Sequence, residues 1–76
     1  MIQPEEVRQM IKKLFPEGEV NVDDQTGTLD HFEIRVASPR FTGKRLIEQH
    51  QMVQAALEEA MADGRIHAVQ IKTVVP

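Results

Sequence analysis

The sequence predicts an α/β (α+β) fold with the element order αββαβ, in which helices cover one face of a three-stranded mixed sheet. The chain has 76 residues, 41% of them hydrophobic, so we expect a single domain, residues 1–76, with one core. Two segments repeat hydrophobic residues at the three- and four-residue spacing of amphipathic helices. Three further segments have the pattern of short strands, so the chain supplies one small sheet and two helices.

The first helix lies close to the N-terminus. Its hydrophobic stripe consists of Val7, Met10, Ile11 and Leu14. Pro4 suits the first turn, because a residue there has no helical partner for its N–H. Pro16 and Gly18 end the helix. We therefore expect an amphipathic helix that packs its stripe on the sheet.

Two strands follow this helix. Residues 19–24 read EVNVDD and residues 31–37 read HFEIRVA, and both alternate hydrophobic with polar side chains. The sequence DDQTGTLD, residues 23–30, lies between them and is rich in turn-forming residues. An antiparallel pair joined by a long hairpin loop is the simplest arrangement.

A longer helix and a last strand complete the chain. The helix spans residues 44–63, and Gly64 closes it. Its predicted apolar stripe is Leu46, His50, Val53, Leu57 and Met61. The last strand covers residues 66–75, and a helical crossover between two strands usually makes them parallel.

His31 and His67 are predicted to lie at the same edge of the sheet, because parallel strands begin at the same edge. Neighbouring strands would be about 4.8 Å apart there. Side-chain alternation opposes a shared site, since in ideal strands the two rings would point to opposite faces. A twisted strand end, or a loop folded over the rim, would bring the two rings together.

Composition restricts the classes of function. The chain contains no cysteine and has a formal net charge of −3, which argues against disulfides and weakly against a dedicated nucleic-acid binder. No hydrophobic run approaches the roughly 20 residues of a membrane span, and the N-terminus lacks a secretory signal pattern. We expect a soluble, cytoplasmic protein. No nucleophile with an adjacent base stands out, so an enzyme is the least favoured class.

The sequence resembles the BolA family over nearly the whole chain. The resemblance rests on four motifs in order: the His31-Phe32 pair, SPRFTGK at residues 38–44, QHQMVQAAL at residues 49–57, and IHAVQIKT at residues 66–73. It implies a fold similar to class II KH domains and a monothiol glutaredoxin as partner. It also implies a shared 2Fe-2S cluster, for which His67 supplies a ligand while the partner's cysteine and glutathione supply thiolates.

The second ligand from this chain is less defined. Many BolA-like proteins have cysteine or histidine in the hairpin loop, whereas this loop has neither. His31 is the nearest candidate, unless this chain supplies one ligand only. The poorer substitutes are Asp23, Asp24 and Asp30. Because imidazole can replace thiolate at a cluster iron, the metal-ligand prediction is His67 with His31.

A DNA-binding regulator that uses the KH-like fold is the alternative function. Its candidate residues are Arg35, Arg40, Lys44 and Arg45, close to the turn that precedes the second helix. Against this, FTGK has one glycine where a KH loop needs G-x-x-G, and three Phe are the only aromatic residues among Phe, Tyr and Trp. We therefore favour a non-enzymatic adaptor that caps a glutaredoxin-held cluster.

Overall fold

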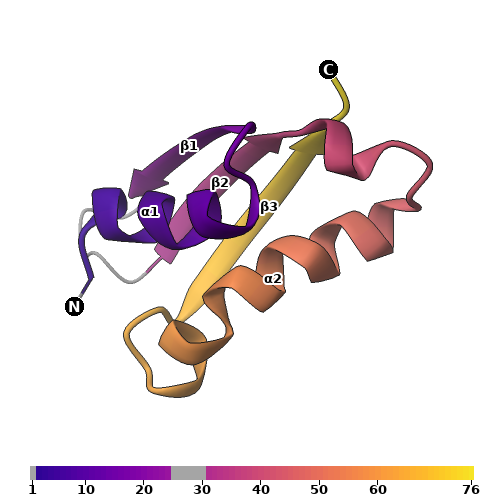
Figure 1. Ribbon diagram of the computed structural model, residues 1–76. Helices are drawn as coiled ribbons and strands as arrows, with labels where there is room; N and C mark the ends of the chain where they lie inside the picture. Colours follow the sequence, from indigo (N-terminus) through magenta and orange to yellow (C-terminus); the bar gives the residue numbers. More distant parts are fainter. Residues whose placement is uncertain (1, 25–30) are drawn as a thin grey trace.

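The computed structural model describes residues 2–24 and 31–76 and has the predicted element order. The elements are α1 (Pro4–Leu14), β1 (Glu19–Asp24), β2 (His31–Ala37), the 3₁₀ helix η1 (Pro39–Phe41), α2 (Leu46–Ala62) and β3 (Ala68–Val74). The strand order is β1-β2-β3, with β1 antiparallel and β3 parallel to β2 (Figure 1). The α+β fold class and the mixed sheet are confirmed.

Helix α1 is fixed at both ends by local hydrogen bonds. Its first turn contains Pro4, and the Glu6 carboxylate accepts a hydrogen bond of 3.2 Å from the backbone N–H of Gln3. Beyond its C-terminal end, the Lys12 ammonium donates to the carbonyls of Pro16 and Gly18 at 3.3 and 2.8 Å. These bonds satisfy backbone groups that would otherwise lack partners, so the helix begins and ends where the sequence indicates.

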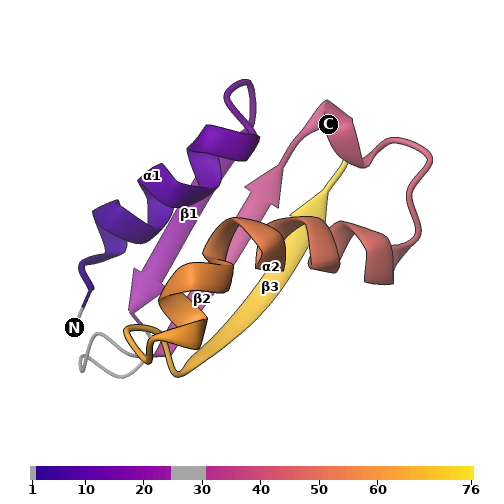
Figure 2. The ribbon, with the colours of Figure 1, turned by 60° about the horizontal axis from the view of Figure 1, so that its bottom comes forward.

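Both helices cover one face of the sheet, as Figures 1 and 2 show. Phe32, Ile34 and Val36 of β2 point to this face and are fully buried. The intervening residues face solvent, and Glu33 forms an ion pair of 3.4 Å with Lys72 of β3. The alternation read from the sequence thus separates a helix-covered face from a charged one.

The segment between β2 and α2 closes the core. Ser38 is fully buried and its hydroxyl accepts a hydrogen bond of 3.1 Å from the N–H of Arg40. This short helical turn directs Phe41 inward, where its ring lies 5.2 Å from that of Phe15, at a tilt of 51°. The aromatic contact joins the end of α1 to the start of the crossover.

The apolar stripe predicted for α2 is only partly buried. Val53 and Leu57 are fully buried, but Leu46 is 64% exposed, so its predicted place in the core is wrong. In both ribbon views the first turn of α2 lies off the side of β3 (Figures 1 and 2). The apolar stripe of α2 therefore extends past the edge of the sheet at the start of the helix, and only its central part is covered.

Two further predictions have different outcomes. The last strand begins at Ala68, two residues later than expected, which changes the surroundings of His67. Of the predicted hairpin loop, Asp23 and Asp24 belong to β1, and residues 25–30 lie outside the described residues. Within the part of the chain that the structure describes, no helix has the length and apolar character to cross a membrane.

Replacing each leucine of α2 by alanine tests this burial pattern. Leu57→Ala should lower the free energy of unfolding by about 2–5 kcal/mol, because it leaves a cavity in the core. Leu46→Ala should change it by less than about 0.5 kcal/mol. Urea unfolding followed by circular dichroism measures both, and equal losses in the two variants would contradict the structure.

A candidate metal-binding site at the start of two parallel strands

The two histidines begin neighbouring strands. His31 is the first residue of β2 and pairs in register with Ala68, the first residue of β3. His67 directly precedes Ala68 and is exposed. The parallel pairing therefore places both imidazoles at one rim of the sheet, as the sequence predicts.

A turn after α2 sets the position of His67. Gly64 has a φ of +84°, a left-handed conformation that glycine adopts without strain. Ile66 is 1% exposed and its N–H donates to the carbonyl of Ala60 at 3.1 Å. This anchored residue immediately before His67 holds the backbone at the sheet rim while the imidazole stays exposed.

The two rings approach each other closely. Their centroids are 6.4 Å apart and their planes meet at 76°. Strand alternation predicted that the two rings would point to opposite faces of the sheet, and they do not. The reason is that His67 precedes the first paired residue of β3, so strand alternation does not fix the direction of its side chain. A loop at the rim, the alternative that the sequence left open, is what brings the rings together.

This geometry suits two ligands of a larger metal site better than a metal site that is complete in itself. Two imidazoles that bind one ion at about 2.0–2.1 Å have ring centroids about 5–6 Å apart, close to the observed separation. In residues 2–24 and 31–76, no group of three or more His, Cys, Asp or Glu side chains could hold a metal ion. A four-coordinate site would therefore need ligands beyond those that the described residues supply.

Two of the acidic substitutes considered from the sequence end β1, the strand on the other side of β2 from β3. Asp23 and Asp24 belong to β1, where they pair with Glu33 and Phe32 of β2. Asp30 lies outside the described residues. Because β1 runs antiparallel to β2, Asp24 lies close to the same rim as His31, whereas the ring of His67 approaches that of His31 from the β3 side.

The four basic candidates for nucleic-acid binding do not share one surface. Arg35 lies on the solvent face of the sheet, directly opposite Lys72 in register. Arg40 lies on the helical side, where its guanidinium donates to the carbonyl of Leu14 and sits 5.9 Å from the centre of the Phe15 ring. Arg40 therefore has a structural role at the end of α1.

Lys44 and Arg45 lie just before α2. Arg45 forms an ion pair of 3.1 Å with Glu48, and its backbone N–H donates to the same carboxylate at 3.0 Å. The backbone bond, the Arg45 side chain and, more weakly, Lys44 lower the pKa of Glu48 from 4.5. Part of the positive charge at this helix start is thus balanced within the chain. DNA binding stays a prediction.

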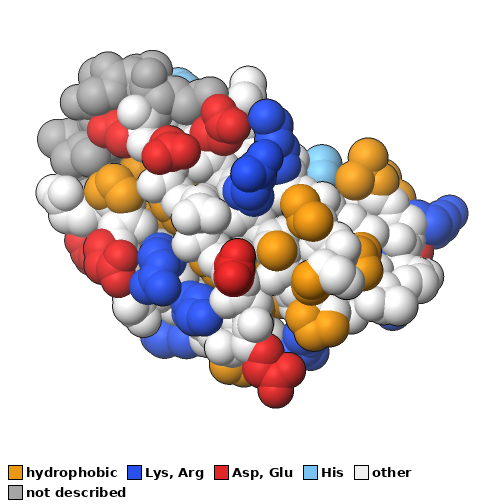
Figure 3. Space-filling view, turned by 90° about the horizontal axis from the view of Figure 1, so that it is seen from above, with side chains coloured by type: hydrophobic (Ala, Val, Ile, Leu, Met, Phe, Trp, Pro, Cys, Tyr) orange, Lys and Arg blue, Asp and Glu red, His pale blue; other side chains and the backbone are white. Residues whose placement is uncertain are grey.

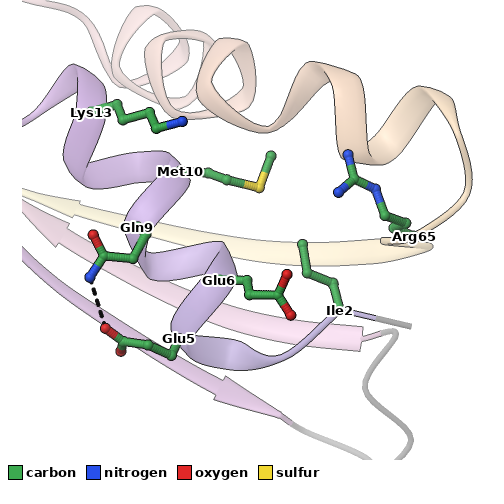
Figure 4. A pocket seen from close by; sticks show the side chains of 7 residues that line it. All are labelled: Ile2, Glu5, Glu6, Gln9, Met10, Lys13 and Arg65. Atoms are coloured by element: carbon green, nitrogen blue, oxygen red, sulfur yellow. Dashed lines mark hydrogen bonds between the residues drawn. The ribbon is translucent and has the colours of Figure 1, made fainter.

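A depression lined by several charged residues lies elsewhere on the molecule. A pocket of about 270 Å³ between α1 and the turn after α2 is lined by Ile2, Glu5, Glu6, Gln9, Met10, Lys13 and Arg65 (Figure 4). Arg65 is held by Asp63 at 2.8 Å, and Gln9 donates to Glu5 at 2.9 Å. Neither His31 nor His67 lines this pocket, so it is separate from the histidine site.

These observations define a small α+β protein with a paired-histidine site at the start of two parallel strands. Residues 8–76 match the model of the BolA-like protein family. The chain belongs to the BolA family.

The similar proteins span most of this chain. Uncharacterized protein RP812 of Rickettsia prowazekii is 34% identical over 73 residues, which cover 96% of this chain and 94% of that protein. BolA-like protein 3 of Homo sapiens is 38% identical over 72 residues, covering 92% of this chain and 65% of the human protein. The structure of BolA1 from Arabidopsis thaliana has a TM-score of 0.87 at 25% identity, covering 100% of this chain and 94% of that one.

The lowered pKa of Glu48 gives a direct test of the contacts that this carboxylate makes at the start of α2. Arg45→Ala removes the guanidinium but keeps the backbone N–H, which has the larger effect on the carboxylate. The pKa of Glu48, followed by NMR titration, should therefore rise but stay below 4.5. Lys44→Ala is the matched control and should move it less. A complete return to 4.5 in Arg45→Ala would assign the whole shift to side chains.

Proposed function

We propose that this protein is a non-enzymatic adaptor that pairs with a cytosolic monothiol glutaredoxin and helps to ligate a shared 2Fe-2S cluster containing glutathione. Its role would be in iron-sulfur trafficking or iron-dependent regulation. The observation that supports this most directly is the approach of the His31 and His67 rings to 6.4 Å at an exposed rim.

The composition of the site agrees with a shared cluster. Histidine can replace cysteine at a cluster iron, and in one known type of centre two histidines bind the same iron. This chain has no cysteine, so the thiolates would have to come from the glutaredoxin and from glutathione. When bound, the cluster would supply redox and iron-responsive chemistry that this chain's side chains lack.

The proposed mechanism is exchange of ligands. Neutral imidazoles of His67 and His31 would replace two ligands of a cluster already held by the partner. Imidazole donors without negative charge raise the reduction potential of a cluster relative to thiolates. The mixed complex would therefore differ in potential and in ease of cluster release from a glutaredoxin homodimer.

Alanine substitution of each histidine tests this mechanism. His67→Ala and His31→Ala should each alter the visible circular dichroism of the mixed complex, because each removes one imidazole donor. His50→Ala is the control, because His50 lies far from the start of β3. Its neighbour Gln49 on α2 accepts a hydrogen bond from the hydroxyl of Thr73, near the other end of β3. A spectrum unchanged in His67→Ala would remove that residue from the site.

A thiolate at the same position gives a complementary test. His67→Cys should keep the cluster in the mixed complex but lower its reduction potential, because a charged thiolate stabilises the oxidised form. Protein-film voltammetry measures the potential, with His67→Ala prepared alongside as the variant that lacks a donor. Loss of the cluster in both variants to the same extent would mean that the ring acts by shape and not as a ligand.

A further inference from the structure

The outer edge of β3 has backbone groups available for pairing. The carbonyl of Val74 accepts a hydrogen bond of 3.1 Å from Ser38, next to β2, so Val74 faces that strand. Because successive residues of a strand direct their N–H and C=O groups to opposite sides, Val69, Ile71 and Thr73 direct theirs away from β2. Among the described residues, no strand pairs with β3 on this side.

The two edges of the sheet differ in chemistry. In β1, three of the six residues are acidic: Glu19, Asp23 and Asp24. In β3, Lys72 is the one charged residue of seven, and the strand has neither proline nor glycine. Charges and proline are the usual means by which proteins keep edge strands from pairing, and β3 has few of them.

Helix α2 leaves a partly apolar flank above this edge. Met52 and Ala55 line a pocket of about 200 Å³ with Leu14 and Phe15, so that side of α2 faces α1. By the helical repeat, the opposite flank carries Ile47, His50, Met61 and the exposed Gln54, while Leu46 continues the buried stripe of Val53 and Leu57 to the start of the helix.

These hydrophobic residues of α2 are incompletely covered. Leu46 and Ile47 are 64% and 60% exposed, and Met61 is only partly buried. Figure 3 shows hydrophobic side chains gathered on the side of the molecule where α2 begins. The apolar pattern of α2 thus continues beyond the region that the three strands cover.

The same incomplete cover affects β3 itself. Val69 and Ile71 point to the helical side, yet both are only partly buried. A fourth strand would lie about 4.8 Å beyond β3, and its apolar side chains would cover Val69, Ile71 and the open flank of α2. One added strand therefore completes the packing at both places.

A second copy of this chain fits this edge poorly. Helix α2 packs on β3, where Gln49 and Thr73 are hydrogen bonded. Pairing of two β3 strands would bring both α2 helices close to the symmetry axis, whereas packed helices need about 8–10 Å between their axes. An extended segment without a helical layer of its own avoids this conflict.

The solvent face of the edge favours acidic residues in such a segment. Lys72 lies opposite Arg35 in register, and like charges opposite each other on neighbouring strands are destabilising. Glu33 lies 3.4 Å from Lys72 and offsets part of this repulsion. A carboxylate on an added strand next to Lys72 would offset more of it.

We propose that the open edge of β3, beneath the flank of α2, binds an extended segment of a partner protein in which hydrophobic residues alternate with acidic ones. The segment adds a fourth strand to the sheet, with its hydrophobic side chains toward α2 and its acidic side chains beside Lys72. This edge begins next to His67, but the proposal does not depend on metal binding.

A synthetic peptide tests this surface without a cluster or a glutaredoxin. The probe has the sequence Thr-Val-Glu-Val-Glu-Val-Thr with blocked ends, which matches the 7-residue length of β3. NMR titration of the full chain should give a Kd of about 0.1–1 mM, and the amides of Val69, Ile71 and Thr73 should exchange more slowly with the peptide bound. Binding should leave the amides of β1 unchanged.

The control peptide Val-Val-Val-Glu-Glu-Thr-Thr has the same composition without alternation. Equal binding of the two peptides would reduce the effect to nonspecific adsorption and overturn the proposal. Unchanged amide exchange in β3 at a saturating concentration of the alternating peptide, or no binding of it, would do the same.

Variants of β3 separate backbone pairing from side-chain contact. Ile71→Pro removes an outward N–H and should weaken binding of the alternating peptide roughly five- to tenfold beyond the effect of Ile71→Ala, which keeps it. Lys72→Glu, at an exposed position, keeps the test decisive should the proline variant not fold. It should weaken binding about threefold at low salt, and equal affinity in Lys72→Glu and the wild-type protein would contradict the proposed orientation.

Discussion

The parallel pairing of β2 with β3 is the constraint on which the rest of the structure depends. It sets His31 opposite Ala68, so His67, the residue before Ala68, lies at the same rim of the sheet as His31. The same register places Ile34 beside Ile71 and Arg35 beside Lys72, which separates a face for the helices from a charged face. The burial of the core and the position of the candidate site thus both follow from the register of β2 and β3.

Much of this architecture could be read from the sequence because it depends on local patterns. The alternation in β2 predicts the burial of Phe32, Ile34 and Val36, all of which are fully buried. The exposure of Leu46 could not be read in this way. Helical periodicity indicates which residues share a face, but it does not indicate how far the opposing sheet extends.

The candidate site shows a similar division. The sequence correctly places both histidines at one edge, since that follows from the order of strands and helices. Strand alternation points their rings apart, and this expectation is wrong because the turn at Gly64 and the buried Ile66 delay the first paired residue until Ala68. Ends of strands are set by tertiary contacts such as these, which no local pattern records. For the same reason, the sequence gives no sign that Arg40 contacts the end of α1.

Pulsed EPR of the reduced mixed complex tests the central claim most directly. The complex would contain a monothiol glutaredoxin, glutathione, and this protein labelled with ¹⁵N only in histidine. If His31 and His67 both donate to the cluster, the spectrum will show ¹⁵N couplings from two distinct imidazoles, and His31→Ala will retain one. Absence of any ¹⁵N coupling from this chain in a complex that holds its cluster would contradict the account.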